Sequence, residues 1–420
     1  MKRIGSLHDI AHLVRPDCQI VLHSGCASPT RLIEQFLEIA PRTGPVRIVD
    51  LTTIGAPAYL PGIETGLLRL LTVVPGRGSR RALKAGRVEI IRKPLSRVPA
   101  HVLSPDFACD ILFLSLSPPD SAGRMTLGVS VDAMRACLMR DPVVVAEINP
   151  NMPATCGQTK VLAEDVDYII DSDAPLVSVA PSPANAIDGA IADNIAGLIR
   201  NGDVLQTGIG TIPDLTALRL MHLRDLGLHS GIVTQAVGPL IEAGVINNST
   251  KRHFAGVSVA TMAAGDPSFY AFLDRNPEVQ FMPCDWTHAL PVLAAIPRLC
   301  AINGALEIDL SGRVNAETVD GRRVSAPGGQ PDFANGAVAA PGGKSIVALR
   351  ATSKAGDVSR IVPRLAPGYL ATLAAGAVTH VVTEFGVAAI QGLTGSDLQY
   401  AIAGIAGPDH RSDLRKSDIG

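Results

Sequence analysis

Short apolar runs rich in β-branched residues recur along the chain and constrain its fold most strongly. Each is followed by a glycine-containing turn and then by a segment with helical spacing. Apolar runs of this length are typical of strands in a parallel sheet whose two faces are both covered. The predicted buried strands are 48–53, 111–116, 143–148 and 378–383, and the predicted helices are 184–200 and 213–223. This alternation predicts an α/β fold with mostly parallel sheets.

The chain length of 420 residues predicts more than one domain, because a single hydrophobic core rarely grows that large. Two segments, Ile20–Phe36 and Val204–Leu220, share the order of strand, glycine-containing turn, proline and amphipathic helix. Proline suits the first turn of a helix, where its missing N–H is not needed. We therefore predict two similar open α/β domains, with an N-terminal domain over 1–183 and a C-terminal domain over 184–420.

Charge and composition exclude several classes of function. The 37 Lys and Arg residues balance 39 Asp and Glu, and aromatic residues make up 4%, which argues against a nucleic-acid partner. No apolar run approaches the ~20 residues that a membrane-spanning helix needs, and we expect no secretory signal at the N-terminus. The seven cysteines are scattered without a CxxC pair, so we expect reduced thiols, a cytoplasmic location and no metal site.

The strongest local signal for chemistry is the turn Gly208-Ile209-Gly210-Thr211-Ile212, which continues into Pro213 and Asp214. Two glycines after a predicted strand allow backbone N–H groups to approach an oxygen atom closely. The helix that follows adds the partial positive charge of its N-terminus. The turn suits a phosphate or a tetrahedral oxyanion. A plain tight turn is the alternative, and the sequence alone does not decide between them.

Four further segments combine polar side chains with strand ends or loops. Each segment, taken alone, is explained by a surface loop or by a carboxylate with a structural role. Lys354 lies in a predicted loop and, taken alone, is interpreted as a solvated lysine. The segments are Gly328–Phe333 with its adjacent Gly328 and Gly329, Ser117–Asp120, Glu147–Pro153, and Thr383–Gly386 with Glu384. Two of them directly follow predicted parallel strands, where ligands bind in open α/β sheets.

In their order and spacing these segments resemble the acetyl-CoA hydrolase/CoA-transferase family, and most closely its 4-hydroxybutyrate CoA-transferase-like branch. The resemblance spans nearly the whole chain and rests on many motifs together. They include HSGCASP, SPPDSAGRMTLGVS, VVVAEINPNMPATCG, LQTGIGTIPD, AGVINNSTKR, INGALEIDLSGRVNAE, GGQPDF, VSRIVPRL and VVTEFGVAAIQG. It implies two similar α/β domains that face each other across an active-site cleft.

The resemblance also implies substrates and binding residues. Coenzyme A is expected as a co-substrate, with no tightly bound cofactor, and the partners are a small acyl-CoA and a carboxylate. A homodimer is the expected assembly. The turn Gly208–Ile212 is expected to approach the reacting thioester. Asn303, Gly328, Gly329 and Lys354 match positions that contact CoA.

The sequence departs from the family at the position of the catalytic nucleophile. Family members carry a glutamate after a Leu-Gly-Ile/Leu-His-Ser/Thr run, and that glutamate attacks the acyl-CoA thioester. Here the run is Leu226–Ser230, and the next residue is Gly231. Glycine has no side chain to acylate, so a glutamyl-CoA intermediate at this position is not available.

Three hypotheses follow from this substitution. The chain is an active transferase in which Glu147, Glu242 or Glu384 replaces the nucleophile, or in which the acceptor acid attacks the thioester directly. Alternatively it is an acyl-CoA hydrolase, with a water in the space left at Gly231 and Glu147 or Glu384 as the base. The third hypothesis is an acyl-CoA-binding protein without catalysis. Transfer of CoA between a short acyl-CoA and a carboxylic acid is the favoured one.

Overall fold

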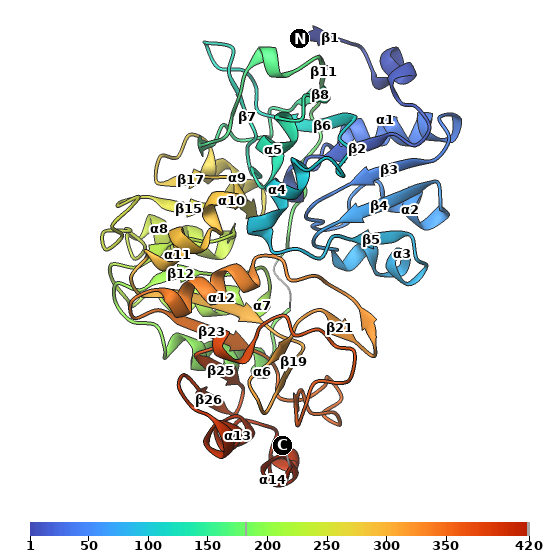
Figure 1. Cartoon of the computed structure of the whole chain (residues 1–420). Coiled ribbons are helices and arrows are strands. Elements are labelled where there is room, and N and C mark those ends of the chain that lie inside the picture. The colour runs from blue at the N-terminus through green and yellow to red at the C-terminus, as the bar shows by residue number, and fades with distance from the viewer. Residues whose placement is uncertain (181–182, 418–420) are drawn as a thin grey trace. The chain divides into compact units, whose positions relative to one another are not determined.

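The computed structural model describes residues 1–180 and 183–417 and divides the chain into two compact units (Figure 1). The first unit contains residues 1–180 and 259–286, and the second contains 181–258 and 287–420. Pro181 and Ser182, which precede the predicted boundary at 183, lie outside the described residues. In the described parts of both units, the mixed α/β architecture with mostly parallel sheets confirms the predicted fold class.

The first unit is built on an eight-stranded sheet in which every pair of neighbours is parallel. Across the sheet the strands are β1 (Lys2–Arg3), β11 (Tyr168–Asp171), β8 (Val143–Ile148), β6 (Ile111–Leu116), β2 (Gln19–Leu22), β3 (Val46–Val49), β4 (Leu68–Thr72) and β5 (Val88–Ile90). Its helices include α1 (Thr30–Ile39), α2 (Leu60–Thr65), α3 (Arg80–Lys84), α4 (Val98–Val102), α5 (Met134–Leu138) and α9 (Pro267–Leu273). The central strands β6 and β2 are buried along their whole length, as largely apolar runs predict.

Residues 259–286 belong to the first unit, although the predicted division placed them in the C-terminal domain. Strand β17 (Val279–Phe281) pairs in parallel with β9 (Cys156–Gly157). The amide of Val131 also donates to the Thr261 carbonyl oxygen, and the amide of Ala263 donates to the Val129 carbonyl oxygen. The chain therefore returns to the first unit for one segment, and these backbone hydrogen bonds hold it there.

The second unit is built on a six-stranded sheet that is parallel except for its last pair. Its strands, in spatial order, are β13 (Gly227–Leu228), β12 (Val204–Gln206), β18 (Leu299–Gly304), β23 (Lys344–Ala348), β25 (His380–Thr383) and β26 (Gly386–Ala389). Its helices are α6 (Ala186–Ala196), α7 (Thr211–Leu218), α8 (Gly238–Glu242), α11 (Leu290–Ala294), α12 (Gln330–Ala339), α13 (Gly395–Gly404) and α14 (Pro408–Lys416). Helix α12 packs on β18 and β23, and α6 packs on β25 (Figure 1).

A small sheet extends the second unit after β18. It contains β20 (Val314–Asn315), β19 (Glu307–Asp309) and β24 (Ile361–Val362), with β19 in the middle. Ile308, Val314 and Ile361 are fully buried and join a core cluster that includes Val347 of β23. The small sheet is therefore packed on the main sheet and does not form a separate domain.

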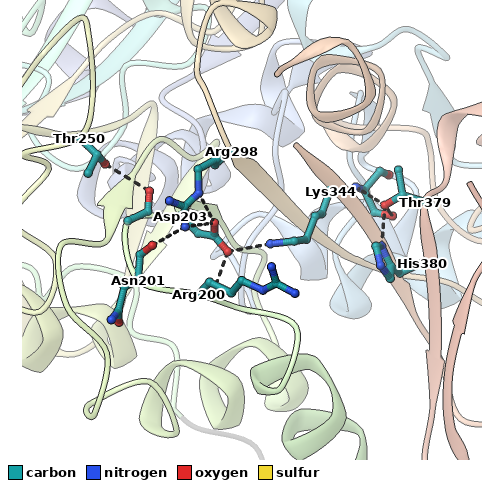
Figure 2. A network of polar contacts seen from close by, with 10 residues as sticks. Arg200, Asn201, Asp203, Thr250, Arg298, Lys344, Thr379 and His380 are labelled. Atoms are coloured by element: carbon teal, nitrogen blue, oxygen red, sulfur yellow. Dashed lines mark hydrogen bonds and ion pairs between the residues drawn. The ribbon is translucent and has the colours of Figure 1, made fainter. Parts of the chain in front are cut away.

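A buried aspartate, Asp203, joins the amino ends of the strands in the second unit (Figure 2). Its carboxylate accepts hydrogen bonds from Arg298 Nε at 2.9 Å, from Lys344 Nζ at 2.8 Å and from the backbone amide of Arg200 at 2.9 Å. Its carbonyl oxygen accepts the amide of Gly227. Asp203 precedes β12, Arg298 precedes β18 and Lys344 begins β23. The aspartate thus fixes neighbouring strands at the edge opposite to their carboxyl ends.

The first unit contains a buried carboxyl group, Asp50, that should make the free energy of unfolding depend on pH. Burial raises the pKa of Asp50 to about 7, although the hydroxyl of Tyr59 donates to its Oδ2 at 2.5 Å. The folded protein therefore holds this proton at pH values where the unfolded chain, with its ordinary pKa near 4, has lost it. Stability from this group is complete below about pH 4 and is lost as the pH rises through about 7.

We therefore expect Asp50→Asn to weaken the fall in stability between about pH 4 and pH 7. The measurement is the chemical-denaturation midpoint of the wild type and the variant across this pH range. Glu147, whose pKa burial also raises to about 7, contributes to the slope that remains. Parallel curves for the two proteins would contradict the prediction.

Candidate active site

The turn Gly208–Ile212 lies at the carboxyl end of β12 and leads into helix α7. Gly210 is the N-cap residue of α7, with φ of 138°, a backbone conformation that favours glycine. No side chain caps the helix at this position, and the Ile209 side chain is exposed. A Cβ atom built at Gly208 or at Gly210 would meet no atom within 4 Å. The turn therefore presents backbone to open space at a helix N-terminus.

The sheet topology favours ligand binding at this edge. From β12 the chain proceeds to β13 on one side, whereas from β18 it proceeds to β23 on the other side. Adjacent strands whose connections leave in opposite directions form a topological switch point, where α/β proteins bind ligands. Asn303, near the end of β18, donates from Nδ2 to Gln206 Oε1 at the end of β12, at 3.0 Å. Asn303 is therefore at the switch point, beside the turn.

The second glycine pair lies at the same edge of the sheet. Gly329 is the N-cap residue of α12, and Gly328 before it has φ of 57°. Gln330 Nε2 donates to the Gly304 carbonyl oxygen at 3.2 Å, which holds the start of α12 against the end of β18. The structure thus brings Gly328 and Gly329 to the neighbourhood of Asn303.

Lys354 lies in the loop that follows β23, the next strand of the sheet. The loop is closed by the amide of Ser353, which donates to the Val358 carbonyl oxygen, and the Lys354 side chain is exposed. The predicted CoA-contacting residues therefore follow three adjacent strands, β12, β18 and β23, at their carboxyl ends.

Gly231 is also close to the turn, because β13 is the parallel neighbour of β12. Ser230 Oγ donates to the Thr207 carbonyl oxygen at 2.9 Å and to the Ile232 carbonyl oxygen at 2.7 Å. The amide of Thr207 contacts the same hydroxyl oxygen at 3.3 Å. The residue before the turn and the residue before Gly231 are thus hydrogen-bonded, and the two segments share one part of the edge.

The space beside Gly231 is filled by His288. A Cβ atom built on Gly231 would lie 2.8 Å from His288 Nε2, 3.2 Å from His288 Cε1 and 3.4 Å from Phe333 Cε2. Contacts under 3.0 Å require one of the atoms to move. The expectation of a water in the volume that a glutamate leaves at this position is therefore wrong for the region next to the Gly231 Cα. An imidazole ring occupies that region.

No motif in the sequence singles out His288. It lies far from Gly231 in the chain, and its histidine neighbours have no spacing typical of metal ligands. Its Nδ1 lies 2.7 Å from Thr287 Oγ1, and its ring meets the Phe333 ring edge-on with centroids 4.8 Å apart. Since Phe333 belongs to the predicted Gly328–Phe333 segment, that segment contributes to the site through its aromatic ring as well as its glycines.

Glu147 has partners that favour a structural role. Its Oε2 accepts the backbone amides of Arg31 at 3.0 Å and Leu32 at 3.1 Å, in the first turn of α1. Burial raises its pKa to about 7, and it belongs to the first unit, whereas the turn belongs to the second. A carboxylate at a helix N-terminus stabilises the helix.

Glu384 and Glu242 are placed away from Gly231 within the second unit. Glu384 Oε2 accepts the amide of Ala351 at 2.9 Å. It follows β25, which is four strand spacings from β13, or about 19 Å at the usual spacing. Glu242 is exposed at the end of α8. Neither placement favours these side chains as a replacement for a nucleophile at position 231.

Asp214 is a carboxylate of the site to which the sequence assigned no role. It lies in the first turn of α7, and its Oδ1 accepts the hydroxyl of Thr234 at 2.9 Å. Burial raises its pKa. The hydrogen bond connects α7 to β14 (Ile232–Thr234), the strand that begins directly after Gly231. Asp214 thus helps to hold the turn and Gly231 in register.

The two predicted strand-end segments of the first unit border a common cavity of about 550 Å³. Pro118 and Pro119 follow β6, and residues 150–154 follow β8. Tyr270 of α9 and Arg275 complete part of the wall. Since β6 and β8 are parallel neighbours, their carboxyl ends bring these segments together, as predicted for ligand sites in such sheets.

No three or more His, Cys, Asp or Glu side chains within the described ranges are grouped so that they would hold a metal ion. In the same part of the chain, every helix is too short or too polar to cross a membrane.

Comparison with protein families identifies both parts of the chain. Residues 1–181 match the acetyl-CoA hydrolase/transferase N-terminal domain, and residues 265–418 match the C-terminal domain of the same family. A 4-hydroxybutyrate coenzyme A transferase of Clostridium kluyveri is 32% identical over 94% of this chain and 92% of its own length. A succinyl-CoA:cyclohexane-1-carboxylate CoA transferase of Geobacter metallireducens is 34% identical over 81% of this chain and 77% of its own.

Solved structures agree with the sequence relatives. RipA from Yersinia pestis superimposes with a TM-score of 0.91 at 26% identity, covering 98% of this chain and 96% of RipA. A 4-hydroxybutyrate CoA-transferase from Porphyromonas gingivalis gives a TM-score of 0.82 at 29% identity, with coverage of 99% and 96%. The similarity thus extends over both units of the chain.

Proposed function

Since this chain belongs to the acetyl-CoA hydrolase/transferase family, we propose that it transfers coenzyme A between a short acyl-CoA and a carboxylic acid. The observation that carries the proposal is the turn Gly208–Ile212 at the switch point of the second sheet. Its glycine backbone faces open space beside Asn303 and the N-terminus of α12. Proteins that are similar to it over most of its length include CoA-transferases.

In this proposal the turn binds the thioester oxygen. Amides of Gly208–Ile212 stabilise the negative charge that develops on this oxygen, and the N-terminus of α7 adds its partial charge. Asn303, Gly328 and Gly329 contact coenzyme A, and the exposed Lys354 meets its phosphates. Coenzyme A enters as a co-substrate, and no tightly bound cofactor takes part.

The absence of a side chain at Gly231 favours direct transfer. A carboxylate oxygen of the acceptor acid attacks the thioester carbon, the C–S bond breaks, and coenzyme A leaves as a thiolate. The thiolate then attacks the acceptor-derived carbonyl of the mixed anhydride and releases the donor acid as a carboxylate. Both substrates must be bound together, so the reaction is sequential and has no acyl-enzyme stage at position 231.

The test is an exchange assay with butyryl-CoA or succinyl-CoA and labelled acetate. We expect label in acetyl-CoA, and initial-rate lines that intersect when both substrates are varied. Parallel lines would indicate a covalent intermediate and contradict the direct route. CoA binding by calorimetry without any exchange would contradict transfer and leave the non-catalytic alternative.

Two further parts of the proposal concern the whole protein. We propose a cytoplasmic homodimer, on the basis of composition and of the usual state of soluble enzymes. Light scattering coupled to size-exclusion chromatography tests the dimer, and a monomeric mass at micromolar concentration would contradict it.

A further inference from the structure

We propose that Lys251 is a positioning residue for the transfer reaction, because it holds the strand end that carries Gly231 in register with the turn Gly208–Ile212. The inference rests on the proposed function, in which this turn binds the thioester oxygen. Lys251 lies in the motif AGVINNSTKR, residues 243–252, which contains neither the turn nor any of the proposed CoA-binding residues. The inference therefore gives a role to a segment that the proposed function leaves without one.

Strand β13 lies at the edge of the six-stranded sheet, with β12 as its neighbour. The amides of Gly227 and His229 donate toward β12, so the polar groups of Leu228 between them face the other side. There the Leu228 amide donates to Asn248 Oδ1 at 2.8 Å, and the Leu228 carbonyl oxygen accepts Lys251 Nζ at 3.0 Å. Two side chains thus take the place of a further strand at the last residue of β13.

The Lys251 side chain is buried and has a second carbonyl partner. Nζ donates to the Val257 carbonyl oxygen at 2.7 Å, and the residue is 5% exposed. Its stem passes close to β13, since a Cβ atom built on Gly227 would lie 3.2 Å from Lys251 Cδ. One amine therefore joins the end of β13 to residue 257, just before the chain leaves the second unit at 258.

The hydrogen bonds of Lys251, more than its packing, distinguish it from an apolar residue. Burial lowers the pKa of Lys251 to about 7, and among the described residues no carboxylate offsets this effect. Burying an amine without an opposite charge is unfavourable, whereas a methionine would fill a similar volume without that penalty. What a methionine would not supply are the two donors for the carbonyl oxygens of Leu228 and Val257.

The end of β13 is connected to the turn through Ser230. Its hydroxyl donates to the carbonyl oxygen of Thr207, the residue before Gly208, at 2.9 Å. A shift of Leu228 would therefore move both Gly231 and the start of the turn. A displacement of about 1 Å in a reacting group can lower the rate of a reaction by about 100-fold. Lys251 thus acts on the reaction through the backbone and does not touch the substrate.

The experiment compares four proteins with the wild type. Lys251→Met removes the donors and keeps the stem, Lys251→Gln keeps a shorter donor, and Lys251→Arg keeps donors at full reach. Thr250→Val is the matched control, because the Thr250 hydroxyl donates to the Gly202 carbonyl oxygen, before β12, and not to β13 (Figure 2). For each protein, kcat and KM are measured for exchange between butyryl-CoA and labelled acetate, together with the unfolding midpoint.

We expect Lys251→Met to lower kcat by about 10- to 100-fold without changing KM for butyryl-CoA. KM should be unchanged because Asn303 and Lys354, which are proposed to contact CoA, belong to β18 and to the loop after β23. Lys251→Arg should retain most of the wild-type kcat, and Thr250→Val should retain all of it. If Lys251→Met does not fold, Lys251→Gln carries the test, with a smaller fall in kcat expected.

Hydrogen–deuterium exchange provides a readout that does not need activity. Peptides that cover residues 204–212 and 226–234 should exchange faster in Lys251→Met, whereas the peptide of β23 should not change. Unchanged exchange and unchanged kcat in Lys251→Met and Lys251→Gln would overturn the inference. An equal loss of kcat in Thr250→Val, or in Lys251→Arg at an unchanged unfolding midpoint, would also overturn it. Faster exchange of these peptides, with no transfer by the wild type, would support the positioning role and contradict the proposed function instead.

Discussion

Replacing Gly231 by glutamate alone should not produce a covalent enzyme, whereas the same replacement combined with His288→Ala should. The reason is steric. The first side-chain atom at position 231 would already lie 2.8 Å from His288 Nε2, and the carboxylate lies two carbon–carbon bonds farther out. The ring cannot turn away easily, because it is buried between Phe333 and Thr287. Overpacking of this kind usually lowers the free energy of unfolding by about 1–3 kcal/mol.

The measurement is the mass of the protein after incubation with acyl-CoA and reduction by borohydride, with peptide mapping of residue 231. Borohydride reduces a glutamyl-CoA thioester to a primary alcohol and releases CoA. We expect residue 231 of the double variant to be converted to this alcohol, and the initial-rate lines to be parallel. The single variant should show neither. Gly376→Glu is the control for an added glutamate, because position 376 has open space around it. Conversion of residue 231 to the alcohol in the single variant, with an unchanged unfolding midpoint, would show that His288 does not block the position.

The glycine at position 231 has two possible origins, loss of the nucleophile alone or its replacement by the His288 ring. A chain that had simply lost its nucleophile would regain it through one substitution. A chain whose histidine has filled the same volume needs two, since the glutamate and the ring exclude each other. The response to the single and double variants therefore distinguishes loss of the nucleophile from its replacement.

The sequence predicted well those elements that depend on local patterns. Ile111–Leu116 and Val143–Ile148 are largely apolar runs, interrupted only by Ser115 and Glu147, and they form β6 and β8 with the same bounds. The strand predicted at 48–53 is Val46–Val49 in the structure, because the exposed Arg47 interrupts the apolar pattern at its start. Helix α6 begins at Ala186, where Asn185 and Asp188 form a capping box.

What the sequence could not predict depends on contacts between distant segments. The return of residues 259–286 to the first unit rests on backbone pairing, such as that of β17 with β9, which has no side-chain signature. The contact of His288 with Gly231 also requires the fold, since a glycine in the sequence does not reveal what fills the space beside it. The glycine turn itself was predictable, because backbone access to a ligand requires glycine at such positions.

Replacing Asp203 by alanine should have the largest effect on stability, although the residue lies at the edge of the sheet opposite to the site. Its carboxylate is 1% exposed and pairs with Arg298 and Lys344, and Lys344 itself is only 19% exposed (Figure 2). Removing one member of a buried pair leaves charges without compensation, which usually costs about 3–5 kcal/mol. We expect a loss of this size in the free energy of unfolding of Asp203→Ala, measured by chemical denaturation.

A double-mutant cycle tests whether the ion pair is the cause. Lys344→Met in the wild type should lower the free energy of unfolding less than Asp203→Ala does. The reason is that Asp203 still accepts hydrogen bonds from Arg298 and from the Arg200 amide. In the Asp203→Ala background, Lys344→Met should lower the free energy of unfolding only slightly or even raise it, because the Asp203 carboxylate that pairs with the lysine is then absent. Additive effects, or a loss below 1 kcal/mol for Asp203→Ala, would contradict a structural role for the network. Since Asp203, Arg298 and Lys344 adjoin β12, β18 and β23, whose other ends carry the proposed CoA-binding loops, the variant should lose CoA binding at the denaturant concentration where it unfolds.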